Sequence, residues 1–175
     1  MSKILKKLTL SDICDRFSEI KNTVILFHVR PDGDAVGSAL ATKLLLEAAG
    51  SRVWCICANE IPQRLAFLSE GIQNSSLPEN MPDDFSIERV ITVDTASSTQ
   101  LGELWNSFGD KIEFMIDHHA KGEPYADYYV ASDAAAAGEI IFDISREMLA
   151  RGIIKAIPGT LETHQVLPKA KNCRA

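Results

Sequence analysis

Three short polar clusters in this sequence contain side chains that could do chemistry. They are His28-Val-Arg-Pro-Asp32-Gly-Asp34, Val93-Asp94 and Asp117-His118-His119. Carboxylates and imidazoles without cysteine suit Mn²⁺, Mg²⁺ or Zn²⁺ rather than a thiophilic metal. If the clusters meet, a cation must offset the repulsion between carboxylates, which would otherwise raise their pKa values. So many ligands favour two ions, an arrangement suited to hydrolysis of phosphate esters.

Each cluster taken alone has a simpler interpretation. Asp32-Gly33-Asp34 alone is typical of a turn, Asp94 of a strand end, and the histidine pair of an exposed surface. The three together, each after an apolar run, favour a site. Gly33 is expected to give backbone freedom in the turn between two ligands. The segment 97–99 could contact substrate or cap a helix.

Four apolar runs are expected to position these clusters. Strands are predicted at 23–27, 52–58, 89–93 and 113–116, with helices at 36–49, from Pro62 to near Gly71, and at 100–108. This alternation predicts an α/β fold: a doubly wound, mainly parallel sheet with helices on both faces. In such sheets sites form at the carboxyl ends of strands, which is where the three clusters lie.

The remaining elements are predicted from local signals. Ser11 could cap a first helix, and 74–84 has the composition of a surface loop. An edge strand is expected at 125–131. A long helix at 134–150 would be capped by Asp133 and ended by Gly152.

The strings HVRPDGDAVGSA, VDTASSTQLG and IDHHAKGEPYADYYV resemble, in order and spacing, the first three motifs of the DHH phosphoesterase family. The likeness covers roughly residues 10 to 150. Within the family it resembles most the bacterial branch that degrades very short RNAs and dephosphorylates 3′-phosphoadenosine 5′-phosphate. The resemblance implies a manganese-dependent phosphoesterase with two Mn²⁺ ions, for which Mg²⁺ or another divalent ion could substitute.

The resemblance also implies a role for each matching residue. His28 and Asp32 would hold one metal, Asp34 and His118 the other, and Asp94 would bridge the two. His119 would face the substrate phosphate, and Asp117 would orient the histidines. Gly37 and Ser38, at the start of a helix, could offer backbone N–H groups to a phosphate oxygen. A hydroxide between the ions is the expected nucleophile.

The sequence also departs from the family pattern. We expect residues 1–152 to form the metal-binding domain without the family's fourth aspartate motif, and 153–175 to form an atypical, basic tail. The family's second, substrate-binding domain is expected to be absent. The basic tail after an acidic body suggests a truncation or frameshift near residue 151. Without the second domain, we expect turnover of dinucleotides at least about 100-fold below that of a full-length relative. Gln100 stands where the family commonly has arginine.

Charge and composition limit the partners. A net charge of −6 argues against binding long nucleic acid and leaves small phosphorylated nucleotides or short oligonucleotides. No apolar run approaches the roughly 20 residues of a membrane helix, and the N-terminus lacks a signal-peptide pattern, which favours the cytoplasm. The four cysteines are expected to be reduced thiols. The alternatives are a non-catalytic metal- or nucleotide-binding remnant, or a hydrolase of pyrophosphate or polyphosphate; a homodimer is compatible with each.

Overall fold

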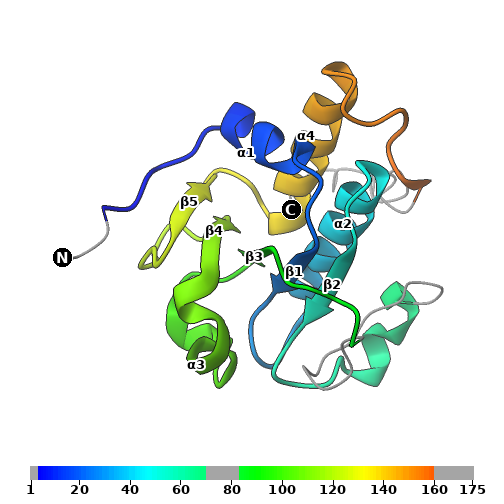
Figure 1. Ribbon diagram of the computed structural model, residues 1–175. Coiled ribbons are helices and arrows are strands. Elements are labelled where there is room, and N and C mark those ends of the chain that lie inside the picture. Colours follow the sequence, from blue (N-terminus) through cyan, green and yellow to red (C-terminus); the bar gives the residue numbers. More distant parts are fainter. Residues whose placement is uncertain (1–3, 70–82, 160–175) are drawn as a thin grey trace, which may run out of the picture.

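The computed structural model describes residues 4–69 and 83–159 and contains one five-stranded sheet (Figure 1). The strands are β1 (Thr23–Leu26), β2 (Val53–Ile56), β3 (Arg89–Val93), β4 (Ile112–Asp117) and β5 (Asp127–Val130). All paired neighbours are parallel, in the order β2-β1-β3-β4-β5. The predicted α/β parallel fold is therefore confirmed, and β5 is an edge strand as expected.

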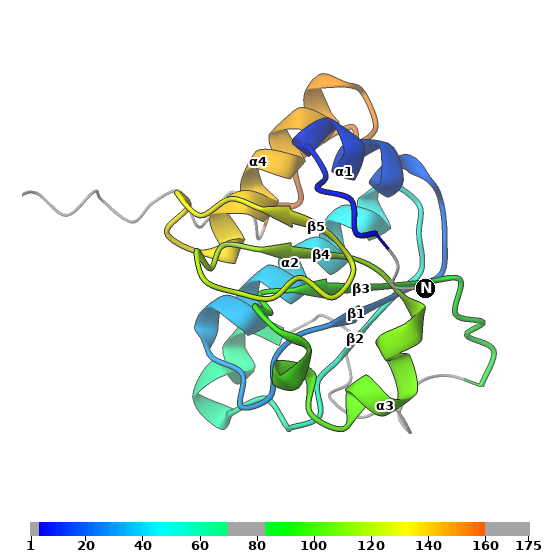
Figure 2. The same cartoon turned by 90° about the vertical axis from the view of Figure 1, so that its left-hand side faces the viewer.

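Helices cover both faces of the sheet. The α-helices are α1 (Leu10–Ser18), α2 (Gly33–Ala48), α3 (Leu104–Phe108) and α4 (Ala137–Ala150), with short 3₁₀ helices η1 (Gln63–Ser69), η3 (Ser98–Leu101) and η4 (Gly109–Lys111). Figure 2 shows α1 and α4 on one side of the sheet and α3 on the other. One apolar core lies under α1, α2 and α4 and a smaller one under α3. No helix in the described part of the chain is long and apolar enough to cross a membrane.

The first two helices begin earlier than the sequence predicted. Thr9, not Ser11, is the N-cap of α1, because Thr9 and Asp12 cap each other's backbone N–H groups. The second helix begins at Gly33 rather than at residue 36. Its N-cap is Asp32, whose carboxylate accepts from the N–H groups of Asp34 and Ala35 at 3.0 Å each. A predicted metal ligand therefore also starts the helix that carries the next one.

A glycine divides the helix predicted at 100–108 into η3 and α3. Gly102 has a positive φ of 58°, which favours glycine. A Cβ at this position would lie 2.8 Å from a side-chain carbon of Val29. The backbone N–H of Val29 also donates to the carbonyl of Gln100 at 2.8 Å. The break thus lets η3 pack closely against the segment that follows β1.

The long helix α4 begins at Ala137 and not at residue 134. Its N-cap is Ala136, which has no side chain able to cap, so the predicted cap by Asp133 is wrong. Gly152, with φ of 70°, follows the helix end as expected. The tail from residue 160, most of the predicted loop 74–84 and the predicted helix end near Gly71 lie outside the described residues. Cys14, Cys55 and Cys57 are buried free thiols.

Candidate metal centre

Asp94 lies at the centre of the polar cluster. It follows the last residue of β3, and its backbone N–H still donates to Ile116 of β4 at 2.9 Å. The residue has φ of 56°, a left-handed conformation that costs energy in a non-glycine residue. Only 2% of it is exposed, and its Oδ1 is buried without a hydrogen bond. Both features are unfavourable in the protein by itself, and they cluster at functional sites.

His28 lies near one oxygen of Asp94, and Asp32 lies beside His28. His28 follows β1, and its Nε2 lies 3.6 Å from Oδ2 of Asp94 and 3.7 Å from Oδ1 of Asp32. The other ring nitrogen, Nδ1, lies 2.8 Å from the carbonyl of Val29, to which it can donate. That contact leaves the Nε2 lone pair free to bind a metal. Ligand atoms of the three residues all lie within 4.8 Å of one another.

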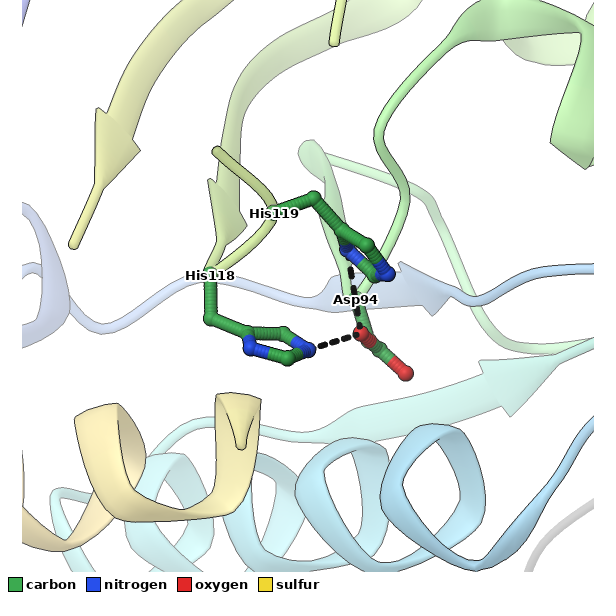
Figure 3. A group of neighbouring side chains, drawn as sticks. All are labelled: Asp94, His118 and His119. Atoms are coloured by element: carbon green, nitrogen blue, oxygen red, sulfur yellow. Dashed lines mark ion pairs between the residues drawn. The ribbon is translucent and has the colours of Figure 1, made fainter. Parts of the chain in front are cut away.

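His118 approaches the other oxygen of Asp94 from the segment that follows β4 (Figure 3). Its Nε2 lies 3.6 Å from Oδ1 of Asp94 and 3.6 Å from Oδ2 of Asp34. Its Nδ1 faces the carbonyl of Ala134 at 3.4 Å, again directing Nε2 inward. The structure therefore brings together all five predicted metal ligands, and Asp94 stands between the two pairs. Metal binding by them stays a prediction.

Asp34 has a second role that the sequence did not show. Its carboxylate accepts from the backbone N–H of Ala137 at 2.8 Å and of Gly138 at 3.0 Å, so it caps α4 from 103 residues away. A carboxylate at this end of a helix is stabilised by free N–H groups and by the helix dipole. The only sequence signal was indirect: the run of alanines at 134–137 offers the helix no capping side chain.

His119 and Asp117 form a pair beside this cluster. The His119 Nδ1–H donates to Oδ1 of the buried Asp117 at 2.8 Å, and the same nitrogen lies 3.8 Å from Oδ1 of Asp94. Figure 3 shows the His119 ring directed toward Asp94. The hydrogen bond to Asp117 raises the pKa of His119 above its ordinary value. Asp117 thus bonds His119, whereas the Ala134 carbonyl faces His118; a role of Asp117 in orienting both histidines stays a prediction.

The backbone around Asp94 is held by residues that the sequence did not single out. The Tyr125 hydroxyl lies 2.7 Å from Oγ1 of Thr92 and also bonds Oγ1 of Thr95, so it links the chain on both sides of Asp94. Gln100 accepts from the N–H groups of Ala96 and Ser97. The glutamine that departs from the family pattern therefore shapes the loop after Asp94.

Gly37 and Ser38, predicted to contact phosphate through their backbone N–H groups, lie inside α2 rather than at its first residue. Both residues lie one turn inside α2, where helical geometry pairs backbone N–H groups with carbonyls of the preceding turn. Ser38 is buried, and its hydroxyl donates to the carbonyl of Ala35. The helix N–H groups nearer the site, those of Asp34 and Ala35, already donate to Asp32. A substrate contact at Gly37 or Ser38 stays a prediction.

The donor set fits divalent cations. Burial and the nearby Asp34 charge raise the pKa of Asp94 to about 6. Burial alone would raise the pKa of Asp32, but the Ala35 N–H and the His28 charge outweigh it, so that pKa is lowered. Two groups of ligand atoms share Asp94, one with His28 and Asp32 and the other with His118 and His119. Nitrogen and oxygen donors around one buried carboxylate, whose Oδ1 lacks a hydrogen bond, fit two adjacent cations.

Comparisons with known proteins identify the family of this chain. The model of the DHH family N-terminal domain matches residues 22–163, most of the chain, and the chain therefore belongs to the DHH family. Members of this family are metal-dependent phosphoesterases.

A solved structure, an exopolyphosphatase-related protein from Bacteroides fragilis, is similar in fold. The TM-score is 0.71 with 22% sequence identity, over 88% of this chain and 47% of that one. This chain thus spans less than half the length of that protein.

Proposed function

We propose that this chain forms the metal-binding part of a two-metal phosphoesterase that hydrolyses short oligoribonucleotides or 3′-phosphoadenosine 5′-phosphate. The observation that carries the proposal is the position of Asp94, whose Oδ2 lies 3.6 Å from His28, whose Oδ1 lies 3.6 Å from His118, and whose Oδ1 lacks a hydrogen bond. Family membership supports the reaction class. The resemblance of the three motif strings supports the nucleotide substrates and Mn²⁺.

Each residue has a defined task in this proposal. His28 and Asp32 would hold one ion and Asp34 and His118 the other, with Asp94 shared between them. Bound Mn²⁺ would lower the pKa of water and offset charge on the phosphate. His119, held by Asp117 and protonated more readily than a free histidine, would hold a proton at Nε2 toward a phosphate oxygen.

Pyrophosphate or polyphosphate is a second candidate substrate. It is supported by the similarity in fold to an exopolyphosphatase-related protein. The same two-cation site could serve either reaction, because both break a phosphorus–oxygen bond. Substrate choice therefore depends on residues around the metal site rather than on its ligands.

Purified chain with Mn²⁺ would be assayed against a diribonucleotide, 3′-phosphoadenosine 5′-phosphate, pyrophosphate and tripolyphosphate. We expect release of mononucleotide or of phosphate from the first two, lost in Asp94→Ala. Turnover of the inorganic substrates alone would establish the second candidate. Binding of Mn²⁺ without turnover of any substrate would contradict the proposal and indicate a binding module.

A further inference from the structure

Beside His119 lies a pocket of about 250 Å³ that the metal site does not use. Its lining includes Lys7, Met115, Asp117, His119, Tyr128 and Val130. Met115 and Asp117 alternate along β4 with Phe114 and Ile116, which face the core under α1, α2 and α4. The pocket therefore lies on the opposite face of the sheet, at its β4–β5 edge.

A loop and not a helix covers this part of the sheet. Gly122 packs so closely on the loop after β3 that a Cβ would lie 2.6 Å from the carbonyl oxygen of Ala96. The N–H of Glu123 donates to the same carbonyl at 2.8 Å. These contacts fix residues 122 and 123, and the pocket is bounded by Ala96, Gly122 and Pro124 on this side.

Lys7 supplies a positive charge to the pocket. The segment around it pairs with β5, since Leu8 N–H donates to Tyr128 O at 2.7 Å and Tyr128 N–H donates to Lys6 O at 2.9 Å. Leu8 is buried in the core on one face, so Lys7 points to the other. The Lys7 ammonium has no hydrogen bond or ion pair within 4–69 and 83–159, whereas the Lys6 ammonium pairs with Asp12 at 2.9 Å.

The position of Lys7 relates the pocket to the candidate reaction centre. Lys7 is level with Tyr128 and Met115, two residues before Asp117 along β4. That register corresponds to about 7 Å along the strand. A ligand with one phosphate at the metal ligands and His119 could therefore extend along the sheet toward Lys7. The carboxylate of Asp117, which also lines the pocket, accepts a hydrogen bond from His119.

We propose that the Lys7 pocket binds a second phosphate group of the substrate, one that is not cleaved. The inference rests on the proposed function and narrows it to substrates that carry at least two phosphates. A second phosphate can come from a nucleotide, as in 3′-phosphoadenosine 5′-phosphate, or from an inorganic polyphosphate chain. Either supplies oxygens that a lysine ammonium can bind by charge-assisted hydrogen bonds.

The test compares Lys7→Ala with Lys6→Ala, a matched loss of one lysine on the other face, and with Lys7→Arg, which keeps the charge. Amide NMR shifts of Gly122 and Tyr128 give dissociation constants independent of turnover. The ligands are AMP against 3′-phosphoadenosine 5′-phosphate, and orthophosphate against tripolyphosphate. Initial rates with Mn²⁺ are measured in parallel on the two cleavable ligands.

We expect the ligand with more phosphates to bind about 10-fold more tightly than its monophosphate partner, the size of one charge-assisted hydrogen bond. Lys7→Ala should abolish that ratio, while Lys6→Ala keeps it and Lys7→Arg restores most of it. A response in only one ligand pair supports the subsite and identifies the source of the phosphate. A ratio of one in the wild type, or one unchanged by Lys7→Ala, overturns it.

The two proposals fail separately. A Lys7-dependent ratio in the NMR titration without turnover of any ligand would keep the subsite and reject the phosphoesterase. Turnover with no such ratio would keep the phosphoesterase and reject the subsite.

Discussion

At the scale of single residues, the cluster is built at a cost to the metal-free protein. Asp94 combines a left-handed backbone, burial and an Oδ1 without a hydrogen bond. The left-handed backbone costs energy in itself, and a buried carboxylate oxygen is unfavourable without a hydrogen-bonding or cationic partner. Cations placed between Asp94 and the facing histidines would provide that partner. The arrangement of Asp94 therefore lowers the stability of the metal-free protein and leaves the carboxylate in position to bind cations.

Asp94→Ala is predicted to remove more Mn²⁺ affinity than any other single ligand change, because its carboxylate faces both ligand pairs. Mn²⁺ titration of the alanine variants of all five ligands measures this. Retention of both ions in Asp94→Ala, with loss in His28→Ala, would show that Asp94 is not the shared ligand.

Asp94→Asn is predicted to stabilise the metal-free protein at pH 7. The raised pKa of Asp94, about 6 against an ordinary 3.8, means that its contribution to stability is present below pH 4 and is lost as pH rises through 6. Relief of this cost is on the order of 2–3 kcal/mol, and asparagine tolerates the left-handed backbone. Urea unfolding in chelator at pH 4 and pH 7 measures it. An equal effect at both pH values would contradict the electrostatic cause.

Asp117→Asn is predicted to lower the pKa of His119, because the hydrogen bond to Asp117 is the main cause of its elevation. The proton on His119 would then be lost at a lower pH. Titration of the His119 ring signals by NMR gives the shift in metal-free protein. Asp110→Asn, in η4 before β4, serves as the control and should leave the His119 pKa unchanged.

At the scale of elements, a distant residue rather than a local one determines where α4 begins. Asp34 in α2 accepts from Ala137 and Gly138, and the helix lacks a capping side chain of its own. The first turn of α4 therefore depends on a residue that also faces His118. A movement of the Asp34 side chain on ion binding would therefore change the capping of α4.

Asp34→Ala is predicted to expose the amides of Ala137 and Gly138 to hydrogen exchange and to cost about 1 kcal/mol of helix capping. Asp133→Ala is the matched control, since Asp133 precedes the helix but does not cap it. Exchange rates by NMR, in chelator, compare the two variants. Equal protection of both amides in wild type and Asp34→Ala would refute the capping role.

At the scale of the whole molecule, the carboxyl and amino ends of the strands have different roles. The carboxyl ends of the strands carry the polar cluster. At the other end, the fully buried Arg89 side chain bonds Glu113, Glu19 and the carbonyl of Arg16, joining β3, β4 and α1. Arg89 begins β3 and Asp94 follows its end, about 16 Å away. Stability and ligand binding should therefore be separable.

Arg89→Leu is predicted to destabilise the fold by about 3 kcal/mol, because it breaks a buried ion-pair network. Mn²⁺ affinity, measured at a temperature where the variant is folded, should stay within about twofold of wild type. Arg52→Ala, which breaks the exposed pair with Asp84, should cost less than about 1 kcal/mol. Similar unfolding midpoints for the two variants would contradict the central role of Arg89.

The sequence alone determined the fold class and which side chains converge. Apolar runs ending in His28, Asp94 and Asp117 predicted parallel strands, and the carboxyl ends of parallel strands lie at one edge. These predictions rest on local patterns, because each apolar run and the polar residues after it are close together in the chain. The glycines after α2 and α4 were predicted for the same reason, since a helix end is a local conformation.

Only the tertiary structure decided how the site is supported. The cap of α4 by Asp34, the Tyr125 link around Asp94 and the pairing of the Lys7 segment with β5 join residues 30 to more than 100 positions apart. The break at Gly102 likewise depends on contact with Val29. Hydrophobic periodicity and local capping rules describe neighbours along the chain. Such contacts therefore have no local signature, because they form only when packing brings distant segments within hydrogen-bond range.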